Sequence, residues 1–188
     1  MGETADSILE ATIRVFMRYG VRRTTMNDIA VEAGLARQTL YSVFANKDEI
    51  LCACIRHFSN DTLNAITRDW QDQTDLGGKL DVFFEHAILA SFRLLRASPD
   101  ARDMADGYNA AGKAAIRQVQ SEKVAHLASM LEQYKTAIAQ FGFNSEQVAD
   151  FLLTAALAAR DSADDEQRLL SLLSVLKSSV LALSGEQG

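Results

Sequence analysis

Polar side chains with distinct hydrogen-bonding geometries are gathered in the run RQTLYS, which begins at Arg37. Arg37 carries a planar fork of N–H donors, and the Gln38 amide offers both donors and an acceptor. Such a fork matches the two acceptors on the edge of a guanine, and an amide matches the edge of an adenine. The hydroxyl groups of Thr39 and Ser42 can bind phosphate oxygens, and Tyr41 can contact either a base in the groove or a phosphate. These residue types favour contacts with nucleic acid.

Two short helices joined by a tight turn would position this run. Thr25 can cap the first helix, and Asp28, three residues later, can complete a capping box. Gly34 stands where a residue in the left-handed conformation would end that helix. In the second helix Leu40 and Phe44 lie one turn apart and would face inward, which leaves the polar run exposed. This pattern is typical of a helix-turn-helix, in which one supported helix enters the major groove of DNA.

Further helices are expected on both sides of this motif. Residues 6–19 form an amphipathic pattern with Leu9, Ile13 and Phe16 on one face, and another helix begins at about Asn46. Phosphates favour the free N–H groups at helix starts, so we expect Thr25 and Lys47 to contact the DNA backbone. The predicted DNA-contacting residues are Thr25, Arg37, Gln38, Thr39, Tyr41, Ser42 and Lys47.

Local charge, rather than net charge, agrees with DNA binding. The chain has a formal net charge of −6. The segment 14–47 nevertheless holds six basic residues and only two acidic ones, Asp28 and Glu32, a local excess of four positive charges. Phosphate contacts require local positive charge, not a basic protein. A solvated surface with scattered arginines is the alternative.

Residues beyond the motif form a succession of amphipathic helices without strand-like alternation. We therefore predict an all-α fold. A three-helix helix-turn-helix domain would occupy residues 1–46, and a larger helical domain for ligand binding and dimerisation would occupy residues 47–188. Helices are expected over residues 46–70, 78–97, 99–106, 114–141, 145–160 and 164–183.

The last two expected helices are more apolar than a surface helix needs to be. Their apolar residues could be buried against their own domain. Alternatively, the helix pair could form a four-helix bundle with its copy around a two-fold axis, giving a homodimer. The interface would then contain Phe151, Leu152, Ala155, Ala159, Leu169, Leu172, Leu173, Leu176 and Val180.

The helix expected over residues 78–97 is apolar around much of its circumference and should be central. Side chains near it could line a cavity for a small molecule, although core packing is the alternative for each. The candidates are Trp70, Phe84, Phe92, Met104, Tyr108, Asn109, Met130, Tyr134 and Phe151. His86 shares a face with Lys79 and Arg93, so we expect it on a solvated surface.

The sequence gives little support for catalysis or metal binding. Cys52 and Cys54 point to opposite sides of a helix, and Cys54 with His57 would supply only two ligands. Recognised catalytic and phosphate-loop motifs are absent from the sequence. We expect no enzymatic activity, metal or cofactor. The sequence has no signal peptide or membrane-spanning run, so we expect a cytoplasmic protein with no membrane partner.

The first fifty or so residues resemble the DNA-binding domain of the TetR family of bacterial repressors. The matching segments are the opening helix ending in Tyr19 and Gly20, the run TTMNDIAVEAG, and the run GLARQTLYSVFANKDEIL. The spacing TLY-x-x-F-x-x-K, from Thr39 to Lys47, is the most specific part.

This resemblance implies a homodimeric, ligand-responsive regulator of transcription. Such a repressor binds a palindromic operator in double-stranded DNA. A small-molecule effector releases it by shifting the helix that begins at Asn46. The alternative is an all-α small-molecule sensor or carrier whose N-terminal helices bind a protein.

Three residues differ from the family pattern. Ala36 replaces the usual Ser or Thr cap, Gln38 replaces a small residue, and Val43 replaces a His or Tyr that would touch phosphate. The operator sequence therefore cannot be predicted from those of relatives.

Overall fold

A computed structural model describes residues 3–186. Its ordered elements are all helical over this range, which confirms the predicted all-α fold. The α-helices are α1 (Glu3–Arg23), α2 (Met26–Glu32), α3 (Arg37–Val43), α4 (Lys47–Asp69), α5 (Leu76–Phe83), α6 (Ala90–Ala97), α7 (Arg102–Ala105), α8 (Ala110–Leu131), α9 (Lys135–Ala139), α10 (Ser145–Ser162) and α11 (Glu166–Leu183). Short 3-10 helices are η1 (Trp70–Asp72), η3 (Pro99–Ala101) and η4 (Glu132–Tyr134), and η2 (Phe84–Leu89) is a π-helix. None of the described helices has the length and apolar character needed to cross a lipid bilayer.

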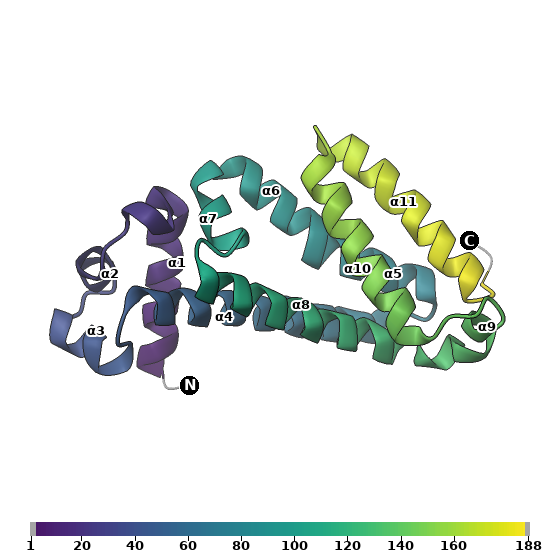
Figure 1. Cartoon of the computed structure of the whole chain (residues 1–188), viewed down its shortest axis with the longest axis horizontal. Coiled ribbons are helices and arrows are strands. Elements are labelled where there is room, and N and C mark those ends of the chain that lie inside the picture. Colours follow the sequence, from purple (N-terminus) through teal and green to yellow (C-terminus); the bar gives the residue numbers. More distant parts are fainter. Residues whose placement is uncertain (1–2, 187–188) are drawn as a thin grey trace. The chain divides into compact units, whose positions relative to one another are not determined.

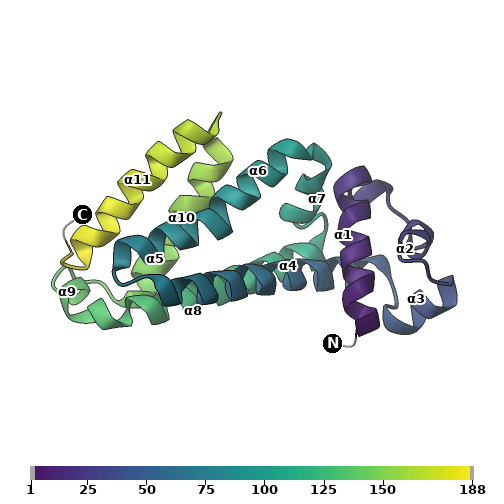
Figure 2. The same cartoon turned by 180° about the vertical axis from the view of Figure 1, so that it is seen from behind.

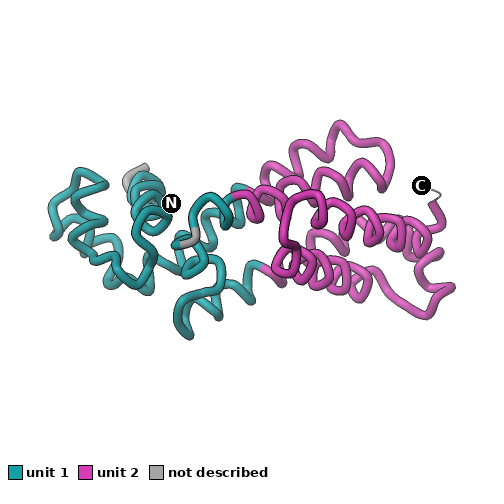
Figure 3. The backbone as a smooth tube through the Cα atoms, turned by 90° about the horizontal axis from the view of Figure 1, so that it is seen from above, with its two compact units in different colours: residues 1–61, 94–119 teal, residues 62–93, 120–188 magenta. Residues whose placement is uncertain are grey.

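The chain divides into two compact units (Figure 3). Unit 1 contains residues 1–61 and 94–119, and unit 2 contains residues 62–93 and 120–188. The helices α4, α6 and α8 each contribute residues to both units. Packing therefore does not divide the chain at residue 46, and a division of function there stays a prediction.

Local sequence signals fix the ends of the first three helices. Gly20, with φ of 76°, interrupts α1 at the predicted end, although the chain continues as a further turn to Arg23. Thr25 and Asp28 form both bonds of the predicted capping box, since the Thr25 hydroxyl accepts from Asp28 N–H and the Asp28 carboxylate accepts from Thr25 N–H. Gly34 has the predicted left-handed φ of 67°. The capping predictions are therefore confirmed.

Unit 1 is held together by one apolar cluster that joins the first four helices. These helices are the purple and blue ribbons of Figure 1. Leu40, which is fully buried, anchors α3 in this cluster. Its other fully buried members include Ile8, Leu9, Phe16, Ile29, Ile50 and Leu51. A helix as short as α3 gains its stability from such packing rather than from its own hydrogen bonds.

Unit 2 has a second apolar cluster, in which α10 and α11 lie side by side (Figures 1 and 2). Leu152 and Leu169 are fully buried there, together with Phe83 and Ile88 from the neighbouring segments α5 and η2. The apolar character of the last two helices is thus largely explained by burial within unit 2.

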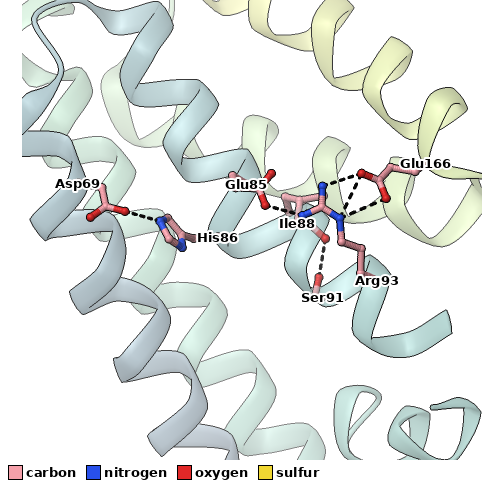
Figure 4. Close-up of polar contacts among 7 residues, drawn as sticks. All are labelled: Asp69, Glu85, His86, Ile88, Ser91, Arg93 and Glu166. Atoms are coloured by element: carbon pink, nitrogen blue, oxygen red, sulfur yellow. Dashed lines mark hydrogen bonds and ion pairs between the residues drawn. The ribbon is translucent and has the colours of Figure 1, made fainter. Parts of the chain in front are cut away.

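The helix expected over residues 78–97 begins earlier, at Leu76, because the Asp75 side chain caps it by accepting from Gly78 N–H. Its middle is the π-helix η2, a rare conformation that inserts extra backbone into each turn. Polar contacts fix this segment on two sides (Figure 4). Glu85 accepts from Arg93 at 2.5 Å, and a His86 ring nitrogen lies 2.8 Å from an Asp69 oxygen. The expectation of a solvated His86 was incomplete, since its side chain is only 29% exposed.

Candidate functional site

The polar run on α3 lies on the surface of unit 1. Arg37, Gln38 and Thr39 are exposed, as are Tyr41 and Ser42. Leu40 and Phe44 point inward and are 0% and 6% exposed. The predicted division of α3 into a buried face and a polar face is therefore present, and it leaves these side chains available to an outside partner. Their contact with DNA stays a prediction.

Arg37 contributes a positive charge to this surface. Its guanidinium carbon lies 5.7 Å from the centroid of the Tyr41 ring, one helical turn further on. Among the described residues it has no carboxylate partner. A guanidinium held by an aromatic face keeps its N–H donors free, because the ring takes up none of them. Arg37 is thus oriented but not neutralised.

The other arginines near the motif are paired with acids. Arg14 lies 3.0 Å and Arg18 lies 4.0 Å from oxygens of Glu32. Arg23 lies 2.7 Å from Asp100, and Arg22 lies 3.6 Å from Asp103. The last two acids are about eighty residues away in sequence, so counting charges over residues 14–47 could not include them. The local positive excess is smaller than the sequence indicated.

Lys47 makes contacts within unit 1 that the sequence analysis did not predict, and its contact with phosphate stays a prediction. Its ammonium donates to the carbonyl oxygens of Val21 at 2.8 Å and Thr24 at 2.9 Å, and it lies 3.5 Å from that of Arg22. These carbonyls lie at the C-terminal end of α1, where a cation also interacts favourably with the helix dipole. The structure therefore ties Lys47 to α1 and leaves it half-buried.

Thr25 is exposed, but its hydroxyl is already engaged. It accepts from Asp28 N–H and also lies 2.8 Å from the Asp28 carboxylate. The bonds from the Thr25 backbone and side chain lower the pKa of Asp28, which keeps this carboxylate charged. A phosphate contact by Thr25 would compete with this capping box, so the prediction for this residue stays untested.

Four of the predicted ligand-binding residues are core residues. Met104 belongs to the apolar cluster of unit 1, and Phe84, Phe92 and Met130 belong to that of unit 2. Each is between 4% and 8% exposed. Core packing, the alternative left open by the sequence, accounts for their burial.

Two further candidates stabilise local structure in unit 1. The Tyr108 ring lies 5.4 Å from the Arg22 guanidinium and 5.8 Å from the Lys47 ammonium. Asn109 accepts from Gly112 N–H at 2.8 Å, as a cap of α8, and donates to Asp48 at 2.7 Å. Neither residue is free for a guest molecule without giving up these contacts.

The remaining candidates belong to unit 2. Trp70 donates to the Lys79 carbonyl at 2.8 Å and stacks on His126 with ring centroids 4.8 Å apart. These residues line an open groove of about 430 Å³ with Met130. Burial, aided by a hydrogen bond to Glu186, raises the pKa of Tyr134 to about 12. Phe151 is 54% exposed on α10.

The predicted dimer residues separate into two groups. The first group is buried in the core of unit 2 and contains Leu152, Leu169, Leu173, Leu176 and Val180. Burial in their own domain, the alternative left open by the sequence, accounts for these five residues, and a role in a dimer interface stays a prediction. Phe151 is exposed, and Ala155, Ala159 and Leu172 are half-buried. Leu170 and Val175, which the sequence analysis did not assign to an interface, are 48% and 67% exposed. Helical periodicity could have found them, because they lie off the buried stripe of α11.

Metal ligands do not cluster in the part of the chain that is described: it contains no group of three His, Cys, Asp or Glu side chains placed to hold an ion. Burial raises the pKa of the Cys54 thiol to about 12, so this sulfur stays protonated.

Known proteins share both the motif and the fold. Residues 8–54 match the family model described as "Bacterial regulatory proteins, tetR family". The HTH-type transcriptional regulator TtgR of Pseudomonas putida is 40% identical over 75 residues, which cover 39% of this chain and 35% of TtgR. The HTH-type transcriptional repressor KstR2 of Mycobacterium tuberculosis is 40% identical over 67 residues, or 36% of this chain and 33% of KstR2. The matched region thus spans about a third of these relatives.

The similarity in fold extends over nearly the whole chain. A transcriptional regulator from Cytophaga hutchinsonii superposes with a TM-score of 0.68 at 23% sequence identity, covering 96% of this chain and 97% of the other. The sequence matches contain the helix-turn-helix, and the named relatives are regulators rather than enzymes. The N-terminal part of the chain is therefore similar in sequence to the TetR family of bacterial regulatory proteins, and the fold of nearly the whole chain is similar to that of a solved transcriptional regulator.

Proposed function

We propose that this protein is a repressor that binds a palindromic DNA operator as a homodimer and leaves it when a small molecule binds. The observation that carries the proposal is the surface of α3, where Arg37, Gln38 and Tyr41 are exposed over a fully buried Leu40. Arg37 reads guanine and Gln38 reads adenine, and Tyr41 holds Arg37 in place. Thr39 and Ser42 contact phosphates beside the groove.

Effector control requires a connection from the ligand-binding helices to the helix-turn-helix. The bonds from Lys47, at the start of α4, to the end of α1 support such a connection. A second set of contacts joins α1 to residues 98–103, through Ser98 with Met17 and through Asp100 with Arg23. A movement of α4 or of this segment would carry α1, and with it α3, away from the groove.

Dimerisation would use the exposed side of α10 and α11. Phe151, Leu170 and Val175 are each about half exposed or more, although large apolar side chains of this kind are usually covered. Pairing of this surface with its copy around a two-fold axis gives two α3 helices for two half-sites.

Operator selection from the source genome tests this proposal. Fragments recovered by the purified protein should contain an inverted repeat, and the dissociation constant should rise steeply with salt. Arg37→Ala should weaken binding to the recovered fragment by about tenfold or more, since a good bidentate pair is worth roughly 1–3 kcal/mol. Arg68→Ala, on an exposed arginine of unit 2, is the matched control and should bind like the wild type. Failure to enrich any sequence would refute the proposal.

A further inference from the structure

An open groove within unit 2 combines aromatic, apolar and cationic side chains. Its volume is about 430 Å³, and its lining residues are Trp70, Lys79, His126, Ser129, Met130 and Gln133. They come from η1, α5, the end of α8 and η4, all of which contribute them to the same compact unit. Sites for small molecules typically have such a wall of apolar and aromatic groups with a few polar groups that fix the orientation of the ligand.

Two stacked rings form the aromatic part of this groove. The rings of Trp70 and His126 have centroids 4.8 Å apart and planes inclined by only 9°. The Trp70 indole N–H donates to the Lys79 carbonyl oxygen at 2.8 Å. The Thr67 hydroxyl oxygen lies 3.3 Å from His126 Nε2, and because that hydroxyl donates its proton to the Leu63 carbonyl, the ring nitrogen is the donor of this contact. Both rings are therefore fixed in advance, which lowers the entropy cost of binding a ligand against them.

Lys79 supplies the positive charge of this groove. The lining residues include no carboxylate, and the Lys79 ammonium has no ion pair among the residues that the structure describes. Burial lowers the pKa of His126, so its imidazole is uncharged at neutral pH. Because Lys79 is half-buried, its ammonium has lost part of its hydration without gaining a protein carboxylate. An anion from outside the protein would replace that missing partner.

We propose that this groove binds the effector and that the effector is an aromatic carboxylate. Its ring packs against the stacked pair and the Met130 thioether, and its carboxylate pairs with Lys79. The Ser129 hydroxyl and the Gln133 amide offer hydrogen bonds to polar substituents on the ring. A neutral aromatic molecule would leave the ammonium unpaired, and an aliphatic acid would not stack. This inference rests on the proposed effector-controlled function, because it names the site and the chemical class of that effector.

Three ligands of similar size test the inference on the intact protein by isothermal titration calorimetry. 2-Naphthoate has both the aromatic ring and the charge, 2-naphthamide lacks the charge, and decahydro-2-naphthoate lacks the aromatic ring. The wild type should bind 2-naphthoate more tightly than either of the other two by about tenfold or more. Equal affinity for 2-naphthoate and one of the others, or no binding of 2-naphthoate, would overturn the inference.

The position of the bound ligand can be measured directly. Trp70 is the single tryptophan of the chain, so its indole N–H gives one nuclear magnetic resonance signal that comes from the groove itself. This signal should shift as 2-naphthoate is added, in step with the calorimetric binding curve. Binding of 2-naphthoate without a shift of the indole signal would place the ligand elsewhere and contradict the inference.

A pair of matched variants tests the role assigned to Lys79. Lys79→Gln should weaken the binding of 2-naphthoate by about tenfold and leave that of 2-naphthamide unchanged, because it removes one hydrogen bond between charged groups. Lys135→Gln is the control and should bind like the wild type, since Lys135 is 67% exposed and does not line the groove. Equal affinities of all three proteins for 2-naphthoate would refute the pairing with Lys79. Should Lys79→Gln fail to fold, the three ligands and the indole signal of the wild type decide the question.

Operator binding separates this inference from the proposed function. Trp70 directly follows α4, the helix that begins at Lys47 and that we expect to transmit effector binding. Addition of 2-naphthoate should therefore raise the dissociation constant of the wild type for its operator by about fivefold or more. Occupation of the groove without any change in operator affinity would overturn the effector assignment and leave DNA binding intact. Conversely, a wild type that binds 2-naphthoate beside Trp70 but binds no DNA would retain the groove as a ligand site and lose the repressor function.

Discussion

Replacing Lys47 by Met distinguishes a structural lysine from one that binds phosphate. The methionine keeps the apolar stem and removes the ammonium that bonds to the carbonyls of Val21 and Thr24. Hydrogen bonds from charged groups contribute about 1.5–3 kcal/mol each, and partial exposure reduces this. We therefore expect a loss of about 2–3 kcal/mol in the free energy of unfolding.

Thermal melting followed by circular dichroism measures this loss. For a chain of this length each kcal/mol lowers the melting temperature by roughly 2–4 °C, so Lys47→Met should melt about 4–12 °C below the wild type. Lys135→Met removes an exposed lysine and should melt within about 2 °C of the wild type.

The salt dependence of DNA binding can refute the structural role of Lys47. A lysine that neutralises one phosphate contributes about 0.9 to the slope of log K against log salt concentration. Lys47→Met should keep the wild-type slope, because its ammonium is bound to α1. An unchanged melting temperature together with a slope reduced by about 0.9 per subunit would show that the phosphate assignment was right and the structural argument wrong.

Three further predictions test other parts of the structure. Ala36→Ser should raise the free energy of unfolding, measured by chemical denaturation, by about 1 kcal/mol, because Ala36 has the extended backbone of an N-cap but α3 has no side-chain cap. An unchanged free energy of unfolding would mean that the N–H groups in the first turn of α3 already have hydrogen-bond partners. Leu169→Ala should lower the stability by about 2–5 kcal/mol, because Leu169 is fully buried, whereas Phe151→Ala at a 54% exposed position should weaken self-association in sedimentation with little loss of folding stability. Burial lowers the pKa of His126, so the folded protein favours the neutral imidazole. The melting temperature should therefore be highest above about pH 6.5, the ordinary pKa of histidine, and should fall at lower pH. If the melting temperature of His126→Phe falls equally with pH, His126 is not the group responsible.

Local signals in the sequence predicted the helix-turn-helix well because they depend on neighbouring residues. The Thr25 capping box, the left-handed Gly34 and the inward Leu40 are each set within one or two helical turns. The polar surface of α3 followed from the same periodicity.

Contacts between residues far apart in the chain could not be predicted from the sequence in the same way. Asp100 and Asp103 neutralise arginines about eighty residues earlier, and Lys47 bonds to carbonyls more than twenty residues earlier. The apolar pattern of α11 predicted that much of this helix is buried but not what covers it, so the sequence left both the core and a dimer interface open for Leu169, which is fully buried in its own unit.

The π-helix η2 has no sequence signal that periodicity can detect, because one continuous apolar helix explains the same residues.

Binding of an operator fragment, followed by fluorescence anisotropy over a range of salt concentrations, tests the central claim most directly. The wild type should prefer an inverted repeat over a scrambled fragment, and Arg37→Ala should lose this preference while its melting temperature stays unchanged, because Arg37 is exposed and without a carboxylate partner among the described residues. If Arg37→Ala and Tyr41→Ala both retain wild-type affinity and sequence preference, the exposed face of α3 is not the surface that reads DNA.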